Sequence, residues 1–130
     1  MNNVDIIKQG YKHFSEGNVE AVLAIFDPEI EWDECTGLPY ISGDGIFHGP
    51  NEIVQNVFAP IPEHIDGFNV EIDDFIDGGN KVVMKGHYTG TWKATGKKFR
   101  ANAAHIWTLH NGKATHFFQA VDIAEIINPD

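Results

Sequence analysis

Two tight-turn dipeptides near the end of the chain most constrain how it can fold. Thr95-Gly96 and Asn111-Gly112 are typical of two-residue hairpins, which require positive φ angles. They separate three alternating segments, residues 81–94, 97–110 and 113–124. Each segment is roughly twice the usual strand length. Strands this long in a chain of 130 residues must curve, and a curved sheet laid over helices encloses a pocket. We therefore expect any functional site inside that curve.

The composition indicates a globular protein with residues 1–130 in one domain, since 42% of residues are hydrophobic and 22% are charged. The net charge of −10 argues against nucleic acid or an anionic membrane as partner. Cys35 is the single cysteine, so no internal disulfide is possible and a reducing compartment is favoured. We recognise no signal peptide and no apolar stretch near the ~20 residues of a membrane span. The expected location is cytoplasmic.

Apolar spacing predicts three helices ahead of the sheet. Residues 4–14 repeat apolar side chains at intervals of three and four, which is one stripe of a helix. Asn18 caps a second helix, and Pro28 ends it. A third helix begins at Pro50 and closes at the prolines of positions 60 and 62.

Between the second and third helices, residues 30–34 alternate as a short strand, and residues 36–49 form a long loop. Residues 68–72 begin the main sheet. Helices segregated ahead of an antiparallel sheet predict an α+β domain.

One face of the second long segment is apolar except for a histidine. Strict alternation places on it Phe99, Ala101, Ala103, His105, Trp107 and Leu109. A two-residue turn at Thr95-Gly96 sets these opposite Trp92, Gly90, Tyr88, Gly86 and Met84. A polar ring in an apolar wall needs a hydrogen-bond partner or a functional role. Two interpretations of His105 stay open: a core histidine bonded to Tyr88 or to backbone, and a functional histidine in a pocket.

The order of elements and several short motifs resemble the SnoaL-like branch of the NTF2-like superfamily, a cone-shaped α+β fold. The similar motifs are Tyr11-x-x-Phe14-x-x-Gly17-Asn18, Phe26-Asp27-Pro28-Glu29-Ile30-Glu31-Trp32, Phe47-His48-Gly49-Pro50, His105-Ile106-Trp107, Asn111-Gly112-Lys113 and Phe117-Phe118-Gln119-Ala120-Val121-Asp122. The superfamily hosts cyclases, isomerases, dehydratases, hydrolases and binding modules. The resemblance therefore implies a fold and a cavity rather than one activity. It also implies a homodimer that pairs through the sheet.

The resemblance bears on which residues of the last segment face the pocket. A plain turn at Asn111-Gly112 places Asp122 on the face of His105, whereas one β-bulge reverses every later side chain. In the similar polyketide cyclases a histidine and an acid fourteen residues apart both face the cavity, and here His105 and Gln119 have that spacing. We therefore predict a bulge that turns Phe117, Gln119 and Val121 inward. An amide cannot act as a general acid or base near neutral pH, so Gln119 departs from cyclase chemistry.

Trp32 and Glu34 share one strand face, and the general base of the similar ketosteroid isomerases aligns with Glu34. Burial in an apolar cavity would raise the pKa of such a carboxyl. The oxyanion donors of those isomerases align nearest to Gly10, with Tyr11 one residue away, and to Ala104, and neither donor is present. The favoured interpretation of Glu34 is a solvated acid at the rim of the cone.

Tyr40 lies near the position of a water-holding tyrosine in the similar epoxide hydrolases. Their acid-arginine-acid set would fall on Gly86, Tyr88 and Gln119, none of which is charged, so that reaction is excluded. A pocket hydroxyl and a loop aromatic packed at the mouth of the cone remain open for Tyr40.

The resulting hypothesis is a small, largely apolar cavity lined by Trp32, Tyr40, Tyr88, His105, Trp107, Phe117, Gln119 and Val121. The expected ligand is a small hydrophobic carbonyl compound, acted on by isomerase- or cyclase-type proton transfer without a cofactor. His105 would be the base or acid and Glu34 the second titrating group, while Tyr40 and Gln119 orient the substrate. The alternative is a binding or accessory module without catalysis. The seven histidines are dispersed, so we expect no metal site.

Overall fold

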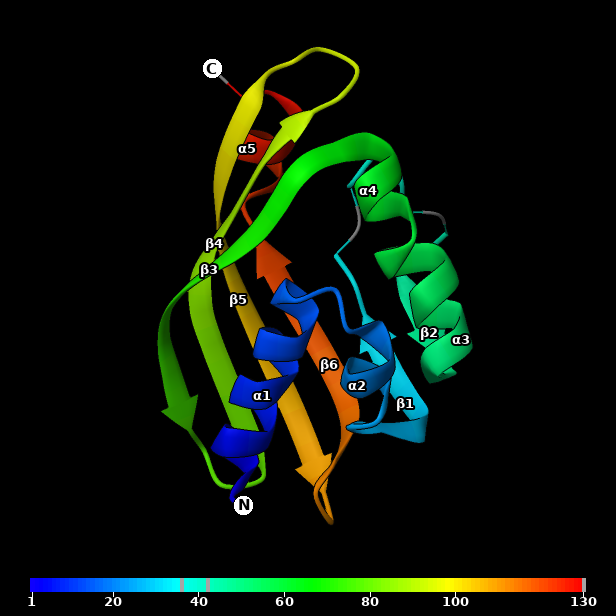
Figure 1. Cartoon of the computed structure of the whole chain (residues 1–130), viewed down its shortest axis with the longest axis vertical. Coiled ribbons are helices and arrows are strands. Elements are labelled where there is room, and N and C mark those ends of the chain that lie inside the picture. The colour runs from blue at the N-terminus through cyan, green and yellow to red at the C-terminus, as the bar shows by residue number, and fades with distance from the viewer. Residues whose placement is uncertain (36, 42, 130) are drawn as a thin grey trace.

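The structure is a computed structural model that describes residues 1–35, 37–41 and 43–129. Its framework is a six-stranded mixed sheet in the order β2-β1-β6-β5-β4-β3 (Figure 1). The strands are β1 (Phe26–Asp33), β2 (Ile46–His48), β3 (Ile65–Asp77), β4 (Lys81–Trp92), β5 (Lys98–His110) and β6 (Lys113–Val121). β1 runs parallel to β6, and the other neighbouring strands are antiparallel. The predicted α+β class with a curved mixed sheet is confirmed.

The helices are α1 (Asn3–Ser15), α2 (Val19–Leu23), α3 (Gly49–Ile53), η1 (Val54–Phe58), α4 (Pro60–His64) and α5 (Ile123–Ile127). In Figure 1, α1 and α2 cover one face of the sheet, and α3 through α4 run beside β1 and β2. The Asn2 side chain caps α1 by accepting from the backbone N–H of Asp5 at 2.9 Å. No helix among the described residues is long and apolar enough to cross a membrane.

The segment expected to end the second helix belongs instead to a strand. β1 begins at Phe26, which pairs with Ala114 of β6, and the backbone N–H of Ala114 donates to the carbonyl of Ile25 at 2.8 Å. Pro28 lies within β1, where the register with β6 shifts, because proline has no N–H to offer the ladder. Pairing with a distant strand thus overrides the local helical pattern.

The prolines expected to close the third helix do not close it. The chain continues through the π-helical turn η1 and α4 as far as His64. The backbone N–H of Ala59 donates to the carbonyl of Val54 at 2.8 Å, which is the wider spacing of a π turn. That local widening accommodates Pro60, which lacks an N–H and crowds the preceding turn.

Two short elements, β2 and α5, were not predicted from the sequence. β2 lies within residues 36–49, which were expected to form a loop. β6 ends at Val121 rather than at residue 124, and α5 follows it near the β4–β5 hairpin (Figure 1).

The predicted two-residue turn at Thr95-Gly96 is wrong. The Trp92 N–H donates to the carbonyl of Lys97 at 2.9 Å, so the loop is longer and His105 lies opposite Met84 instead of Gly86. Gly96 has a positive φ of 73°, but the β-branched Thr95 disfavours the second positive φ that a two-residue turn requires. The register moves by two residues, which leaves the predicted inner face unchanged.

The predicted β-bulge between β5 and β6 is confirmed. Asn111 and Gly112 adopt φ of 50° and 75°, as a two-residue turn requires. Leu109 then pairs with Ala114 but Thr108 pairs with His116, which leaves one extra residue in β6. His105 and Gln119 consequently lie directly opposite each other on the concave face.

Candidate functional site

An apolar cavity of about 70 Å³ lies between the helices and the concave face of the sheet. Eight residues singled out from the sequence lie on its wall: Trp32, Glu34, Tyr40, Tyr88, His105, Trp107, Phe117 and Gln119. Val121, the ninth, is not among the described lining residues. It packs instead against the neighbouring apolar cluster that includes Ala101 and Ala103. β6 ends at Val121, beyond the part of the strand that borders the cavity.

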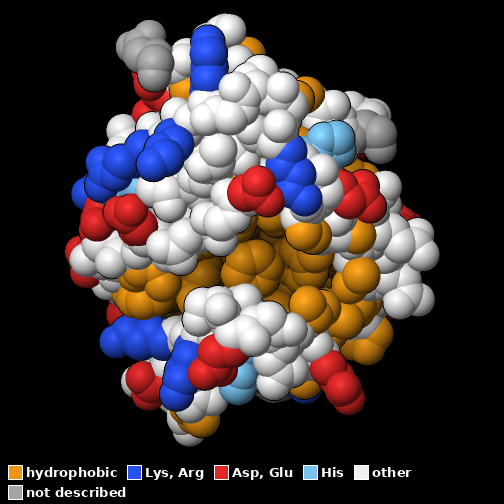
Figure 2. All heavy atoms as spheres, turned by 45° about the horizontal axis from the view of Figure 1, so that its top comes forward, with side chains coloured by type: hydrophobic (Ala, Val, Ile, Leu, Met, Phe, Trp, Pro, Cys, Tyr) orange, Lys and Arg blue, Asp and Glu red, His pale blue; other side chains and the backbone are white. Residues whose placement is uncertain are grey.

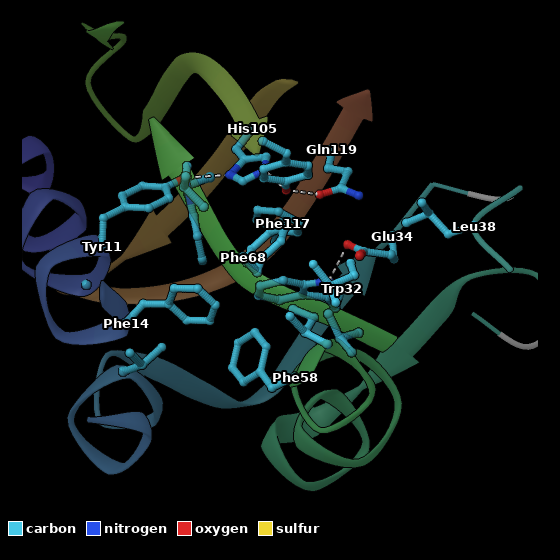
Figure 3. Close-up of a pocket in the computed structure, with 18 of the residues that line it drawn as sticks. Tyr11, Phe14, Trp32, Glu34, Leu38, Phe58, Phe68, His105, Phe117 and Gln119 are labelled. Atoms are coloured by element: carbon cyan, nitrogen blue, oxygen red, sulfur yellow. Dashed lines mark hydrogen bonds between the residues drawn. The ribbon is translucent and has the colours of Figure 1, made fainter. Parts of the chain in front are cut away.

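The wall is dominated by aromatic rings that pack on Phe117 (Figure 3). The ring of Trp32 stacks on Phe117 with centroids 3.8 Å apart, and the rings of Trp107 and His105 meet it edge-on at 4.6 and 4.8 Å. Phe117 is 1% exposed. Such close ring packing fixes the positions of the polar atoms that these side chains carry.

Hydrogen bonds join the two ring nitrogens of His105 to two tyrosines. Tyr88 donates its hydroxyl proton to Gln119 Oε1 at 2.5 Å. The Tyr88 oxygen is therefore an acceptor toward His105 Nε2, so the imidazole proton lies on Nε2. His105 Nδ1 then accepts from the Tyr11 hydroxyl at 2.6 Å, and Trp107 Nε1 donates to the Tyr11 oxygen at 2.9 Å.

The result is a directional chain of donors that starts at Trp107 and ends at the amide of Gln119. It leaves neither ring nitrogen of His105 free for a ligand. Burial lowers the pKa of His105 to about 3, partly opposed by Gln119, because an imidazolium cannot be solvated there. Burial also raises the pKa values of Tyr11 and Tyr88, so both tyrosines remain protonated donors.

We predict that His105 stays neutral, with its proton on Nε2, throughout the range from pH 8 to pH 4. Nitrogen-15 NMR of labelled histidine reports both the charge and the proton position. The same titration of the protein unfolded in denaturant gives the reference curve. An inflection near pH 6.5 for His105 in the folded protein would contradict the hydrogen-bond assignment.

Glu34 follows β1 directly and is 6% exposed, so the prediction of a solvated rim residue is wrong. Its backbone N–H donates to the carbonyl of Gly45 at 2.8 Å, and the buried Leu38 lies beside it (Figure 3). Trp32 Nε1 donates to Glu34 Oε1 at 3.1 Å. Burial raises the pKa of Glu34 to about 7, although hydrogen bonds from Trp32 and Gln119 partly oppose this.

Tyr40 lies on the cavity wall with its ring stacked on His64 at 5.4 Å and tilted toward Trp92 at 6.2 Å. Burial raises the pKa of Tyr40, and the nearby charge of Glu34 raises it further, so the hydroxyl stays protonated. The Cys35 thiol accepts from Gln119 Nε2 at 3.2 Å, and burial raises its pKa.

The sequence interpretation missed Tyr11 as a polar group of the site. It placed Tyr11 in the apolar stripe of the first helix, in a motif of the resembling family, and one residue away from an isomerase donor, but gave it no role in the site. The signal was a hydroxyl within that stripe, which must find a partner when buried. Phe14, Phe58 and Phe68 also line the cavity (Figure 3).

Among residues 1–35, 37–41 and 43–129, no group of three His, Cys, Asp or Glu side chains is arranged to hold a metal ion. The described residues on the cavity wall offer the titrating carboxyl of Glu34 and several neutral hydrogen-bond donors in an apolar surrounding.

Several solved structures are similar to this protein over nearly the whole chain. An NTF2-like protein from Burkholderia thailandensis is 33% identical with a TM-score of 0.91, over 98% of this chain and 95% of that one. An NTF2-like protein of unknown function from Burkholderia pseudomallei is 29% identical with a TM-score of 0.88, over 98% and 95%. TerC, co-crystallised with polyporic acid, is 25% identical with a TM-score of 0.85, over 96% and 95%.

No curated protein matches the chain. The family model of the SnoaL-like domain matches residues 7–117, which include the cavity residues from Tyr11 to Phe117. The chain belongs to the SnoaL-like family, within the NTF2-like fold.

Proposed function

We propose that this protein catalyses cofactor-independent proton transfer on a compact hydrophobic carbonyl compound, with Glu34 as the group that carries the proton. The observation that supports this most directly is a buried carboxyl whose pKa is near 7, on the wall of an apolar cavity. A general base works best when its pKa lies near the working pH. His105 was the sequence-based candidate for this role, but both of its nitrogens are bonded to tyrosines.

In this proposal the Glu34 carboxylate removes a proton from the carbon next to the substrate carbonyl, and negative charge develops on the carbonyl oxygen. Tyr40 lies on the same cavity wall, and burial together with the charge of Glu34 raises its pKa. Its hydroxyl donates a hydrogen bond to that oxygen. In a β,γ-unsaturated substrate the charge is shared with the γ-carbon. The protonated Glu34 returns the proton there, so the carbon–carbon double bond moves into conjugation with the carbonyl and no atom is gained or lost. His105 is a positioning residue that holds Tyr88, and Tyr88 in turn holds Gln119.

Exchange of carbon-bound hydrogen for deuterium tests the proposal without knowledge of the natural substrate. The probe is 2-tetralone in D₂O, followed by proton NMR. The expected exchange rate above the buffer background rises with pH and levels off above about pH 7, because only the ionised Glu34 accepts a proton. Bound 2-tetralone that exchanges no faster than in buffer at any pH would exclude this activity.

A ligand-binding module without catalysis is the second candidate. The engaged imidazole and the amide at Gln119 favour it, because neither can act as a general base. Saturation-transfer NMR would then show that 2-tetralone binds, while its exchange rate stays at the buffer value.

We also propose a homodimer that pairs through the convex face of the sheet. Phe118 is 39% exposed there and lies opposite Ile106, which in turn lies opposite Val83. Light scattering should give a mass of twice 14.5 kDa for the native chain and the monomer mass for Phe118→Glu. A native monomer would exclude this assembly.

A further inference from the structure

A second cavity, of about 340 Å³, lies between α1 and β3. We call it the α1–β3 groove, and it is lined by Lys8, Tyr11, Lys12, Phe14, Ser15, Phe68, Asn69, Val70, Ile72 and Phe75. Four of these residues, Tyr11, Phe14, Phe68 and Val70, also line the inner cavity. These shared side chains, which are aromatic except for Val70, therefore separate the groove from the inner cavity.

The groove is cationic in a strongly acidic protein. The chain has 19 acidic and 9 basic residues, yet the described residues that line the groove include two lysines and no acid. Two neighbouring carboxylates of β3 have partners of their own: Glu71 pairs with Arg100 at 3.5 Å, and Asp73 Oδ2 lies 3.2 Å from His87 Nδ1. Charge complementarity thus favours an anionic occupant.

The two lysines are placed where they repel each other. Lys8 and Lys12 are separated by one turn of α1, and like charges at this spacing destabilise a helix. Neither takes part in the ion pairs formed among the described residues. The Lys8 ammonium lies 5.6 Å from the centre of the Phe75 ring, so cationic and aromatic surfaces adjoin within the groove.

The sizes of the two spaces complement each other. Ligand sites commonly occupy about 300–1,000 Å³, so the inner cavity of about 70 Å³ accommodates only the reacting end of a ligand. The groove offers about 340 Å³ for the remainder. Figure 2 shows an apolar hollow crossing one face of the molecule, with both cationic and acidic side chains along its edges.

We propose that the α1–β3 groove binds the anionic group of an amphipathic aromatic ligand, whose apolar end separates the edge-on rings of Phe14 and Phe68 to reach the inner cavity. Lys8 and Lys12 hold the carboxylate, sulfonate or enolate of that ligand, and Phe75 packs against its ring. The inference rests on the proposed function for the chemistry at the inner end, but anion binding in the groove does not require turnover.

The test compares two fluorescent probes that differ by one charged group. 8-Anilinonaphthalene-1-sulfonate carries a sulfonate, and N-phenyl-1-naphthylamine is the same ring system without it. Each is titrated into the native protein, into Lys8→Gln/Lys12→Gln, and into the matched variant Lys97→Gln/Lys98→Gln. The matched variant loses the same charge from exposed positions outside the groove.

The expected result is about a fivefold increase in the Kd of the sulfonate probe for Lys8→Gln/Lys12→Gln, the size expected for two exposed ion pairs. The neutral probe should bind all three proteins within about twofold. Amide NMR shifts on binding the sulfonate probe should be largest at Lys8, Lys12, Phe68 and Val70.

Equal weakening of the sulfonate probe by the matched variant would overturn the proposal, since it would show only the effect of net charge. Equal weakening of both probes, or no change for either, would also overturn it. None of these outcomes depends on proton exchange at Glu34, so the groove and the proposed activity fail separately.

Discussion

Glu34→Gln is expected to lower the rate of proton exchange at least about a hundredfold, the smallest effect typical of losing a general base. The same change should raise the free energy of unfolding at pH 8 by about 3 kcal/mol. One substitution would thus remove activity and add stability. The desolvation that raises the pKa of Glu34 toward the working pH also makes its ionised form unfavourable in the folded protein.

The direction of this change in the free energy of unfolding follows from proton binding. The pKa of Glu34 is about 7 in the folded protein against 4.5 for an unperturbed carboxyl, so the folded state holds its proton more tightly. Stability from this group is complete below pH 4.5 and is lost as the pH rises toward 7. Glutamine has no proton to lose, so the variant gains at pH 8 and gains nothing at pH 4.

His105 acts in the opposite direction, because its pKa is about 3 in the folded protein against 6.5 for an unperturbed imidazole. Its contribution to stability is present above pH 6.5 and is lost as the pH falls toward 3. Both the native protein and Glu34→Gln contain His105, so this contribution cancels in their comparison.

Urea unfolding at pH 4 and pH 8 measures the stability difference, and 2-tetralone exchange measures the rate. Glu29→Gln is the matched control, since it makes the same change at an exposed position of β1. A variant that is less stable than the native protein at pH 8 would show that Glu34 is not a buried, desolvated carboxyl.

Gly86→Ala is expected to lower the free energy of unfolding by about 3 kcal/mol, the upper end of the usual cost of overpacking. A Cβ at this position would lie 2.1 Å from the carbonyl oxygen of Glu71 and 3.0 Å from Met84 Sδ. Gly86 lies in β4 opposite Ile72, next to a register shift that bends β3. Relief requires backbone movement of a paired strand, not a change of rotamer.

Lys85→Ala, one residue earlier on β4 and exposed, is the control and should change stability little. Urea unfolding of both variants decides the prediction. Near-native stability of Gly86→Ala would mean that β3 and β4 do not approach each other closely at this point.

The sequence predicts the concave face of the sheet well because side-chain alternation has a period of two. The β4–β5 register differs from prediction by two residues, and this error leaves Tyr88 and His105 on the same face. The bulge in β6 was predictable only with the help of the spacing between His105 and Gln119. Alternation alone would have placed Asp122 inside instead.

The features that the sequence did not predict depend on contacts between distant segments. Glu34 is buried on the cavity wall and its backbone N–H donates to the carbonyl of Gly45, which no local pattern reveals. The pairing of Phe26 with Ala114 decides where β1 begins. Tyr11 joins His105 only because α1 crosses the concave face of β5.

The extra residue in β6 has a consequence for how such proteins diversify. Thr115 is the residue left out of the ladder. A hairpin that paired Thr115 with Thr108 would turn Phe117 and Gln119 outward and Phe118 and Ala120 inward, with no substitution in those side chains. Gain or loss of the bulge therefore exchanges the entire set of side chains that a ligand meets along β6, a route to a new interior that needs no point mutation in the cavity wall.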